Sequence, residues 1–200
     1  WPTWLVFWPD QARAALQYRV DLMAQAAENT QHLSVWLKDF TPGSPIDKYE
    51  PKQLEGLRFP WESALAGVEQ CSPSDENHIV GDIATAFRQY FRATHDVDWL
   101  RSSGFPVLDG IARYYASRVS LGPDGLYHTY GHQGPDEYHD NVTDSAYGNA
   151  VGAASLMSAY DLAATAGQTP NETYKAIATK LHVPYDAKLD YHPEYAEAQW

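Results

Sequence analysis

Apolar residues recur at intervals of three and four along several stretches of the chain, which is the spacing of one face of an α-helix. The first stretch opens on Pro9 and Asp10, a pair that commonly starts a helix. Two later stretches carry apolar stripes that include aromatic residues. The pattern predicts helices over residues 9–33, 77–94 and 105–119.

Two more helices are predicted toward the C-terminal end. The fourth begins at Thr143 or Asp144, runs to Ala166 and is rich in alanine and other small residues. The fifth covers "TPNETYKAIATKL", with Thr169 as its cap and Pro170 at its first helical position. Before the fourth helix, the segment "LYHTY" predicts a short strand.

Long connections rich in glycine and proline separate these helices. Residues 39–60 and residues 120–141 are the two longest, and both are predicted to be loops. Loops of this length inside a compact domain usually carry function. The alternation predicts an all-α fold, in which helical hairpins form a toroid and the loops meet at one end.

Composition narrows the class of protein. The chain has 200 residues, enough for one domain, and a net charge of −12 from 14 basic and 26 acidic residues. That charge argues against a nucleic-acid partner and against an anionic membrane surface, since both require a basic face. No run of 18 apolar residues exists, so no membrane span is expected. The aromatic start, "WPTWLVFWPDQ", lacks the basic residues of a signal peptide.

Cysteine and aromatic content add two points. The single cysteine, Cys71, excludes an internal disulfide and a cysteine-based metal site, and it is interpreted as a small buried apolar residue. The 7 tryptophans and 14 tyrosines suit core packing, and they equally suit a sugar-binding cleft, where flat rings lie against pyranose faces. Composition leaves both alternatives open.

The loop "GHQGPDEYHDN" gathers acidic residues and histidines behind a Gly-Pro turn. In one interpretation, Asp136 and Glu137 are solvated turn carboxylates. In the other, Tyr138 and His139 shield Glu137 from water, which raises the pKa of its carboxyl and makes it a general acid. Cleavage of a glycosidic bond needs such an acid, because the leaving oxygen must be protonated.

The segment "FPWESALAGVEQC" places Trp61 beside Glu62, with Glu69 seven residues further on. Two helical turns would bring both carboxylates to one side. One interpretation is a buried tryptophan with two surface glutamates. The other is a sugar platform, Trp61, with carboxylates that accept hydrogen bonds from sugar hydroxyls.

Two other patterns carry less chemistry. His78 and Asp82 stand four residues apart on the second predicted helix, which suits a metal pair, a polar pair facing a cleft, or a structural pair. One pair does not make a metal site, so no metal and no cofactor is expected. The segment "YHPEY" near the C-terminal end is interpreted as a turn, with no chemistry assigned.

Taken together, these motifs resemble glycoside hydrolase family 65. That family includes acid trehalases, maltose, kojibiose and trehalose phosphorylases, and the glucosidase acting on glucosyl-galactosyl-hydroxylysine of collagen. The matching motifs occur in the family's order: "FWPDQARAALQYR" (7–19), "FPWESALAGVE" (59–69), "HIVGDIA" (78–84), "GPDEYH" (134–139) and "PYDAKLDYHPEY" (184–195).

The resemblance implies an (α/α)6 barrel with its active site among the loops at one end. It implies that Glu137 is the general acid and that Trp61 and Glu62 lie near the glucose, with Glu69 a weaker member of the same wall. Asp136, Tyr138 and His139 would then position or tune the acid. The expected substrate is a small carbohydrate, and the expected activity is inverting hydrolysis of an α-glucosidic bond in a trehalose-like or glucosyl-galactosyl disaccharide.

Family barrels are much longer than this chain, so residues 1–200 are expected to be the central part of one catalytic domain. The remaining parts of that domain are its expected partner, and they would supply the catalytic base. Alternatives are a phosphorylase of the same family and a non-catalytic carbohydrate-binding or structural protein. The "WES" form of the second motif favours the hydrolase.

Two N-glycosylation sequons, at Asn141 and Asn171, suit a secreted, vacuolar or lysosomal protein, and a cytoplasmic one remains an alternative. Asn171 is the better candidate, because a glycan on Asn141 would obstruct the cleft beside Glu137.

Overall fold

A computed structural model of the protein describes residues 1–38, 53–61, 63, 65–68 and 76–198. Long helices dominate these residues, and a two-residue antiparallel ladder pairs β1 (Ser120–Leu121) with β2 (Tyr127–His128). The helical elements are α1 (Pro2–Phe7), α2 (Pro9–Asp21), α3 (Met23–Lys38), α4 (His78–Thr94), α5 (Val97–Trp99), the π-helical η2 (Leu100–Gly104), α6 (Phe105–Arg118), α7 (Ala146–Ala166) and α8 (Glu172–Ala178).

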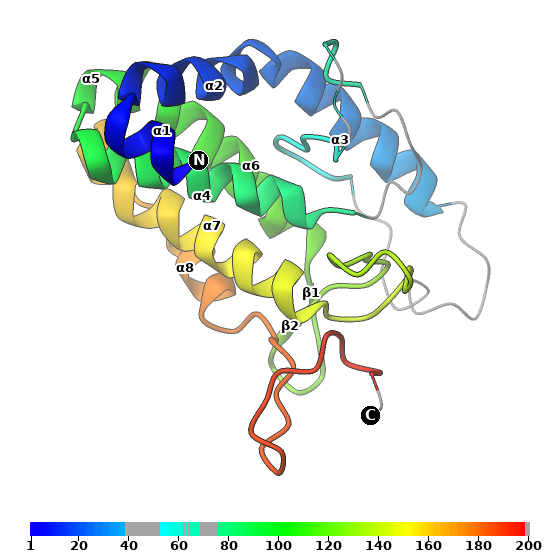
Figure 1. The fold of residues 1–200 in the computed structure, drawn as a ribbon. Helices are drawn as coiled ribbons and strands as arrows, with labels where there is room; N and C mark the ends of the chain where they lie inside the picture. Colours follow the sequence, from blue (N-terminus) through cyan, green and yellow to red (C-terminus); the bar gives the residue numbers. More distant parts are fainter. Residues whose placement is uncertain (39–52, 62, 64, 69–75, 199–200) are drawn as a thin grey trace.

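Helix α7 lies at the centre of the packing and contacts α4, α6 and α8 (Figure 1). Because many of its residues are small, α7 can pack closely against these neighbouring helices. A Cβ atom added at Gly152 would lie 2.9 Å from the ring of Tyr115 on α6. A Cβ atom added at Gly81 of α4 would lie 2.5 Å from Cγ2 of Val151 on α7. The alanine-rich composition of α7 therefore reflects close helix–helix contact on several sides.

Two predicted helices match the structure closely. α4 follows Asn77, and Val80, Ile83, Phe87 and Tyr90 form its buried face. α6 ends one residue before the predicted limit of 119. Both helices have a long apolar stripe of the correct period, because each buries one face in the core.

The prediction of a single helix over residues 9–33 is wrong. The helical hydrogen bonds are interrupted at Leu22, whose φ and ψ are −99° and 12° and whose N–H bonds to the carbonyl of Val20. α2 ends before it and α3 begins after it. The short helix α1 was not predicted at all. Of the predicted loop 39–60, residues 39–52 lie outside the described part, and residues 53–60 contain neither helix nor strand.

The last two helices begin later than predicted. Asp144 has a positive φ of 49°, and its buried carboxylate accepts a hydrogen bond from the Thr129 amide at 2.8 Å, so it stays outside α7. Ser145 caps α7 instead, by accepting from the Gly148 amide. α8 is capped by Asn171, and neither Thr169 nor Pro170 has the predicted role. The strand predicted from "LYHTY" reduces to β2.

The longer connections lie at one end of the helices, whereas the α4–α6 connection through α5 lies at the other (Figure 1). The first residues of α4 and α7 and the last residues of α6 all face the end with the longer connections, next to residues 129–145. Among the described residues, no helix has both the length and the apolar character that a bilayer crossing requires. The position of the longer connections at one end agrees with the predicted toroid.

Candidate active site

The loop of residues 131–141 is held firmly at its base. The backbone groups of His132 and Val142 exchange hydrogen bonds at 3.1 and 2.8 Å, which closes the loop. Arg118, fully buried at the end of α6, donates to the carbonyls of Tyr130 and Gly131. The ring of His132 is buried, and burial together with the charges of Arg118 and His78 lowers its pKa well below the ordinary value. A neutral, buried His132 ring therefore lies at the base of the loop.

Glu137 lies at the outer part of the loop and is exposed, as is Tyr138, whose side chain is 94% exposed. The shielding of Glu137 by Tyr138, which motivated the general-acid prediction, is absent from the described structure. The backbone carbonyl of Glu137 accepts a hydrogen bond from Gln133 Nε2 at 3.4 Å. The Glu137 carboxyl is thus accessible to a substrate, and any burial of it must come from that substrate or from other parts of the protein.

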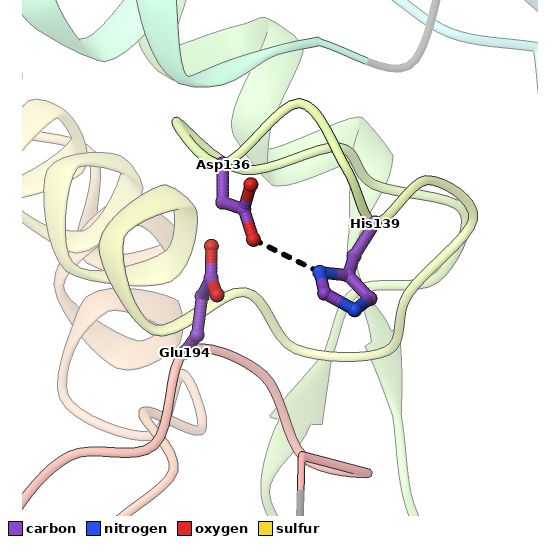
Figure 2. Close-up of side chains that lie close together, drawn as sticks. All are labelled: Asp136, His139 and Glu194. Carbon is purple, nitrogen blue, oxygen red and sulfur yellow. Dashed lines mark hydrogen bonds and ion pairs between the residues drawn. The ribbon is translucent and has the colours of Figure 1, made fainter.

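The side chains of Asp136 and His139, which lie on either side of Glu137 in the sequence, contact each other. Oδ2 of Asp136 lies 2.9 Å from Nδ1 of His139, and Oδ1 accepts from the Tyr138 amide at 3.1 Å. Glu194, from the C-terminal segment, approaches the same two side chains (Figure 2). One ligand atom from each of the three lies within 4.8 Å of the others.

The charges in this cluster influence one another. The hydrogen bonds from His139 and from the Tyr138 amide lower the pKa of Asp136. Burial and the Asp136 carboxylate raise the pKa of Glu194. The cluster has the ligand types of a cation site, but it is partly exposed, and such acidic groups also gather without an ion.

A second polar network lies at the start of α4. His78 is buried, with Nδ1 3.3 Å from Asp82 and Nε2 3.2 Å from the buried Glu76. Burial alone lowers the pKa of His78, but these hydrogen bonds outweigh it and raise that pKa. Tyr147 of α7 donates to Asp82 at 2.6 Å, which raises the pKa of Tyr147 to about 12. The His78–Asp82 pair is thus part of a hydrogen-bonded network that also includes Glu76 and Tyr147.

This network is continuous with the loop. Glu76 forms an isolated parallel bridge with Gln133, the residue that contacts the Glu137 backbone. Tyr147 is 45% exposed, so its hydroxyl end of the network reaches the surface. The start of α4, the start of α7 and the loop therefore present connected polar groups at one end of the fold.

A third group of contacts joins β2 to the residues that precede α7. Nδ1 of His128 lies 2.6 Å from the buried Asp144, and Nε2 lies 3.1 Å from the exposed Asp124. Burial lowers the pKa of His128, but the two carboxylates outweigh burial and raise it. The contact fixes the residues that lead into α7.

The remaining predicted residues are only partly described. Trp61 is half-buried, whereas Glu62, Glu69 and Cys71 lie outside the described residues. Near Trp61, the hydroxyl of Ser63 lies 2.5 Å from that of Tyr18 and accepts from Arg19 at 3.1 Å, which ties this segment to α2. The structure thus places Asp136, Glu137, Tyr138 and His139 in one loop, and it leaves their relation to Glu62 and Glu69 as a prediction.

Glu194 is the residue that the sequence interpretation missed. The segment "YHPEY" repeats the histidine, glutamate and tyrosine of "EYH", and that repetition was the available signal. Its proximity to Asp136 arises from the fold, because 58 positions separate the two in the chain.

Comparison with known proteins assigns the family. The sequence model of the glycosyl hydrolase family 65 central catalytic domain matches residues 46–198, about three quarters of the chain. The chain belongs to glycosyl hydrolase family 65. The resemblance drawn from its motifs is therefore confirmed.

Several family 65 proteins with named activities are similar to the chain. It is 36% identical to the protein-glucosylgalactosylhydroxylysine glucosidase of Danio rerio, over 98% of this chain and 28% of that relative. It is 29% identical to the kojibiose hydrolase of Flavobacterium johnsoniae, over 90% of this chain and 24% of the relative. It is 26% identical to a kojibiose phosphorylase of Caldanaerobacter subterraneus, over 92% of this chain and 26% of the relative. The chain thus spans about a quarter of the length of these relatives.

The fold of the chain also matches that of a solved structure. A kojibiose phosphorylase candidate from the human microbiome superimposes with a TM-score of 0.72 at 18% identity, over 94% of this chain and 27% of the other. This likeness, with the helical architecture, confirms the predicted all-α class and a partial (α/α)6 barrel.

Proposed function

We propose that the complete protein is an inverting glycoside hydrolase that cleaves an α-glucosidic bond in a disaccharide-type substrate. The observation that carries the proposal is the family match across a chain that keeps the "GPDEYH" loop, with the carboxyl of Glu137 exposed. The relatives named as glucosidase and hydrolase favour hydrolysis, and the first of them favours a glucosyl-galactosyl substrate over a trehalose-like one.

In the proposed mechanism, Glu137 donates its proton to the glycosidic oxygen as the bond between that oxygen and the anomeric carbon breaks. Water attacks the same carbon from the opposite face and gives its proton to a carboxylate base. In inverting enzymes the two carboxyls lie about 6.5–9.5 Å apart, which leaves room for that water. We propose that the base comes from a part of the protein outside this chain.

The exposure of Glu137 has a consequence for this mechanism. A general acid must hold its proton near the working pH, and loss of water around a carboxyl raises its pKa. We propose that the bound sugar, together with Trp61 and parts of the domain outside this chain, supplies that loss of water. Glu62 and Glu69 would then accept hydrogen bonds from the glucose hydroxyls, while Tyr138 contacts the substrate from the rim.

Residues 1–200 are proposed to form part of one catalytic domain, which the remaining barrel helices complete. For the compartment, we propose a secreted or lysosomal setting with Asn171 as the glycan acceptor. Asn171 is exposed, and Oδ1 of its side chain accepts the capping bond from the Thr173 amide. Asn141 is half-buried within the loop and is the weaker acceptor. Mass measurement before and after deglycosylation, with an Asn171→Gln variant, tests this assignment.

A phosphorylase of the same family is the second candidate, and the similarity to a kojibiose phosphorylase favours it. It differs from the hydrolase in using inorganic phosphate in place of water. The third candidate, a non-catalytic carbohydrate-binding protein, would bind the same sugars without cleaving them.

One experiment separates these candidates. The complete protein is incubated with a glucosyl-galactosyl disaccharide, kojibiose or trehalose, with and without inorganic phosphate, and the products are followed by proton NMR. Phosphate-independent release of glucose, first as the β-anomer, is the expected result. A sugar 1-phosphate formed only with phosphate would assign the phosphorylase instead. Binding without any cleavage would assign the third candidate.

A further inference from the structure

Residues 194–197 contact residues 143–146, which connect the loop of residues 131–141 to α7. The carbonyl of Glu194 accepts from the Ala146 amide at 2.8 Å, at the first residue of α7. The Ala196 amide donates to the Thr143 carbonyl at 2.9 Å, and Oε2 of Glu197 accepts from the Thr143 amide at 3.1 Å. Three hydrogen bonds therefore join two segments that lie about fifty positions apart, and they fix the backbone of residue 194 relative to the loop.

From this fixed position, the side chain of Glu194 is directed toward Asp136 and His139 (Figure 2). Its carboxyl oxygen belongs to the group of ligand atoms that lie within 4.8 Å of one another. The next residue, Tyr195, adds a ring contact with His139 at 5.4 Å between centroids. Residues 194 and 195 thus approach both Asp136, which precedes Glu137, and His139, which lies two positions after it.

Asp136 and His139 close a small ring of contacts around Glu137. One carboxylate oxygen of Asp136 accepts from the Tyr138 amide at 3.1 Å, and the other lies 2.9 Å from the His139 ring. These contacts connect the residue before Glu137 to the two residues after it. A side chain that holds Asp136 and His139 in place therefore sets the direction in which the Glu137 side chain leaves the loop.

We propose that Glu194 is a positioning residue for Glu137, which holds Asp136 and His139 and thereby orients the proton donor of the loop. The inference rests on the proposed function, since it assigns a partner to the proposed general acid. Burial and the Asp136 carboxylate raise the pKa of Glu194, whereas the hydrogen bonds from His139 and the Tyr138 amide lower that of Asp136, so Glu194 is the carboxyl of this pair that takes up a proton more readily. When protonated, Glu194 can donate a hydrogen bond to Asp136.

A hydrogen bond donated by Glu194 to Asp136 makes a distinctive prediction for two substitutions. Glutamine in place of Glu194 keeps a donor and the side-chain length, whereas alanine removes both. A misplacement of about 1 Å at a reacting group can reduce turnover by about 100-fold. We therefore expect E194A to lower kcat by about 10- to 100-fold with KM changed by less than about threefold. E194Q should retain kcat within about threefold of the wild-type value.

The control variant is Glu172→Gln, at an exposed glutamate whose carboxylate accepts from Tyr160 at 3.0 Å on α7. It makes the same chemical change far from the loop, and its kcat should be unchanged. Equal losses of kcat in E194A and E194Q would overturn the positioning role of a protonated Glu194. So would a loss confined to KM, which would place Glu194 in substrate binding.

Hydrogen exchange gives a second measurement that does not need activity. Release of Asp136 should expose the Tyr138 amide, so exchange in residues 136–139 should be about 10-fold faster in E194A than in the wild type, and unchanged in E172Q. Unchanged exchange in E194A would contradict the inference even if the protein proved inactive on glucosides. Inactive wild-type protein with faster exchange in E194A would contradict the proposed function and leave the positioning contact intact.

Treatment with a chelator distinguishes a positioning role of Glu194 from a role as ligand of a bound cation. If Asp136, His139 and Glu194 held a divalent cation, EDTA should reproduce the E194A changes in the wild-type protein. We expect no effect of EDTA on kcat or on exchange in residues 136–139, and an effect equal to that of E194A would overturn the proposal.

Discussion

Nδ1 of His139 lies 2.9 Å from Oδ2 of Asp136, so the residue before Glu137 is joined to the second residue after it. Through this pair and the bond from the Tyr138 amide, the side chain of Asp136 connects three residues of the loop. The same Asp136 carboxylate acts on Glu194, whose pKa it raises together with burial. Asp136 therefore couples the charge of the loop to that of the C-terminal segment.

The first prediction concerns this electrostatic coupling. Asp136→Asn removes the negative charge next to Glu194 and keeps an oxygen that can accept from the Tyr138 amide. The pKa of Glu194 should fall in this variant, because the charge that opposed its ionisation is gone. A carbon-13 NMR titration of the side-chain carboxyls, with Glu194 assigned through E194Q, measures the shift. Asp109→Asn is the control, and an unchanged Glu194 pKa in D136N would contradict the coupling.

The second prediction concerns His128, which lies between Asp144 and Asp124. The pKa of His128 is raised in the folded state, so its protonated form stabilises the fold below the unfolded pKa of about 6.5. That contribution is lost as the pH rises through the folded pKa. A hydrogen bond to a charged group contributes about 1.5–3 kcal/mol, and we expect the lower end because His128 also faces solvent.

The measurement is the free energy of unfolding in urea for the wild type, H128N, D144N and the double variant, at pH 5.5 and pH 8.5. The coupling energy between the two positions should be clearly larger at pH 5.5. D144N alone also disturbs Thr129 and Asn149, and the cycle removes that contribution. A coupling energy that is the same at both pH values would show that the charge of His128 does not matter.

The third prediction tests the packing of α7 between its neighbours. Gly81→Ala would place a methyl group 2.5 Å from Cγ2 and 2.7 Å from Cβ of Val151, and 2.9 Å from the hydroxyl of Tyr115. Overpacking of this kind costs about 1–3 kcal/mol of the free energy of unfolding. Val151→Ala in the same molecule should recover part of that loss. If G81A is as stable as the wild type, α4 and α7 are further apart than the structure indicates.

Local periodicity predicted the parts of the fold that depend on one buried face. α4 and α6 were found within one residue of their predicted limits, because their apolar stripes are continuous. The break at Leu22 was not predicted, since the residues on both sides of it favour a helix. The late start of α7 depends on the contact of Asp144 with Thr129, which joins positions far apart in the chain and leaves no local pattern.

The candidate site shows the same division. "GPDEYH" indicates Glu137 through its residue types, and the role of Glu137 as general acid stays a prediction. The exposure of Glu137 contradicts the local argument that neighbouring aromatic residues bury it, because Tyr138 faces solvent. Glu194 was missed for a physical reason: its role depends on hydrogen bonds from residues 194–197 to Thr143 and Ala146, which only the folded chain brings together.

The central claim is that Glu137 donates the proton to the leaving oxygen, and Glu137→Gln tests it most directly in the complete protein. General acid catalysis contributes about 100- to 10,000-fold, so E137Q should lower kcat/KM on the disaccharide by about that factor. The loss on α-glucosyl fluoride should be much smaller, because fluoride leaves without a proton. Wild-type kcat/KM on the disaccharide, or an equal loss on both substrates, would contradict the account.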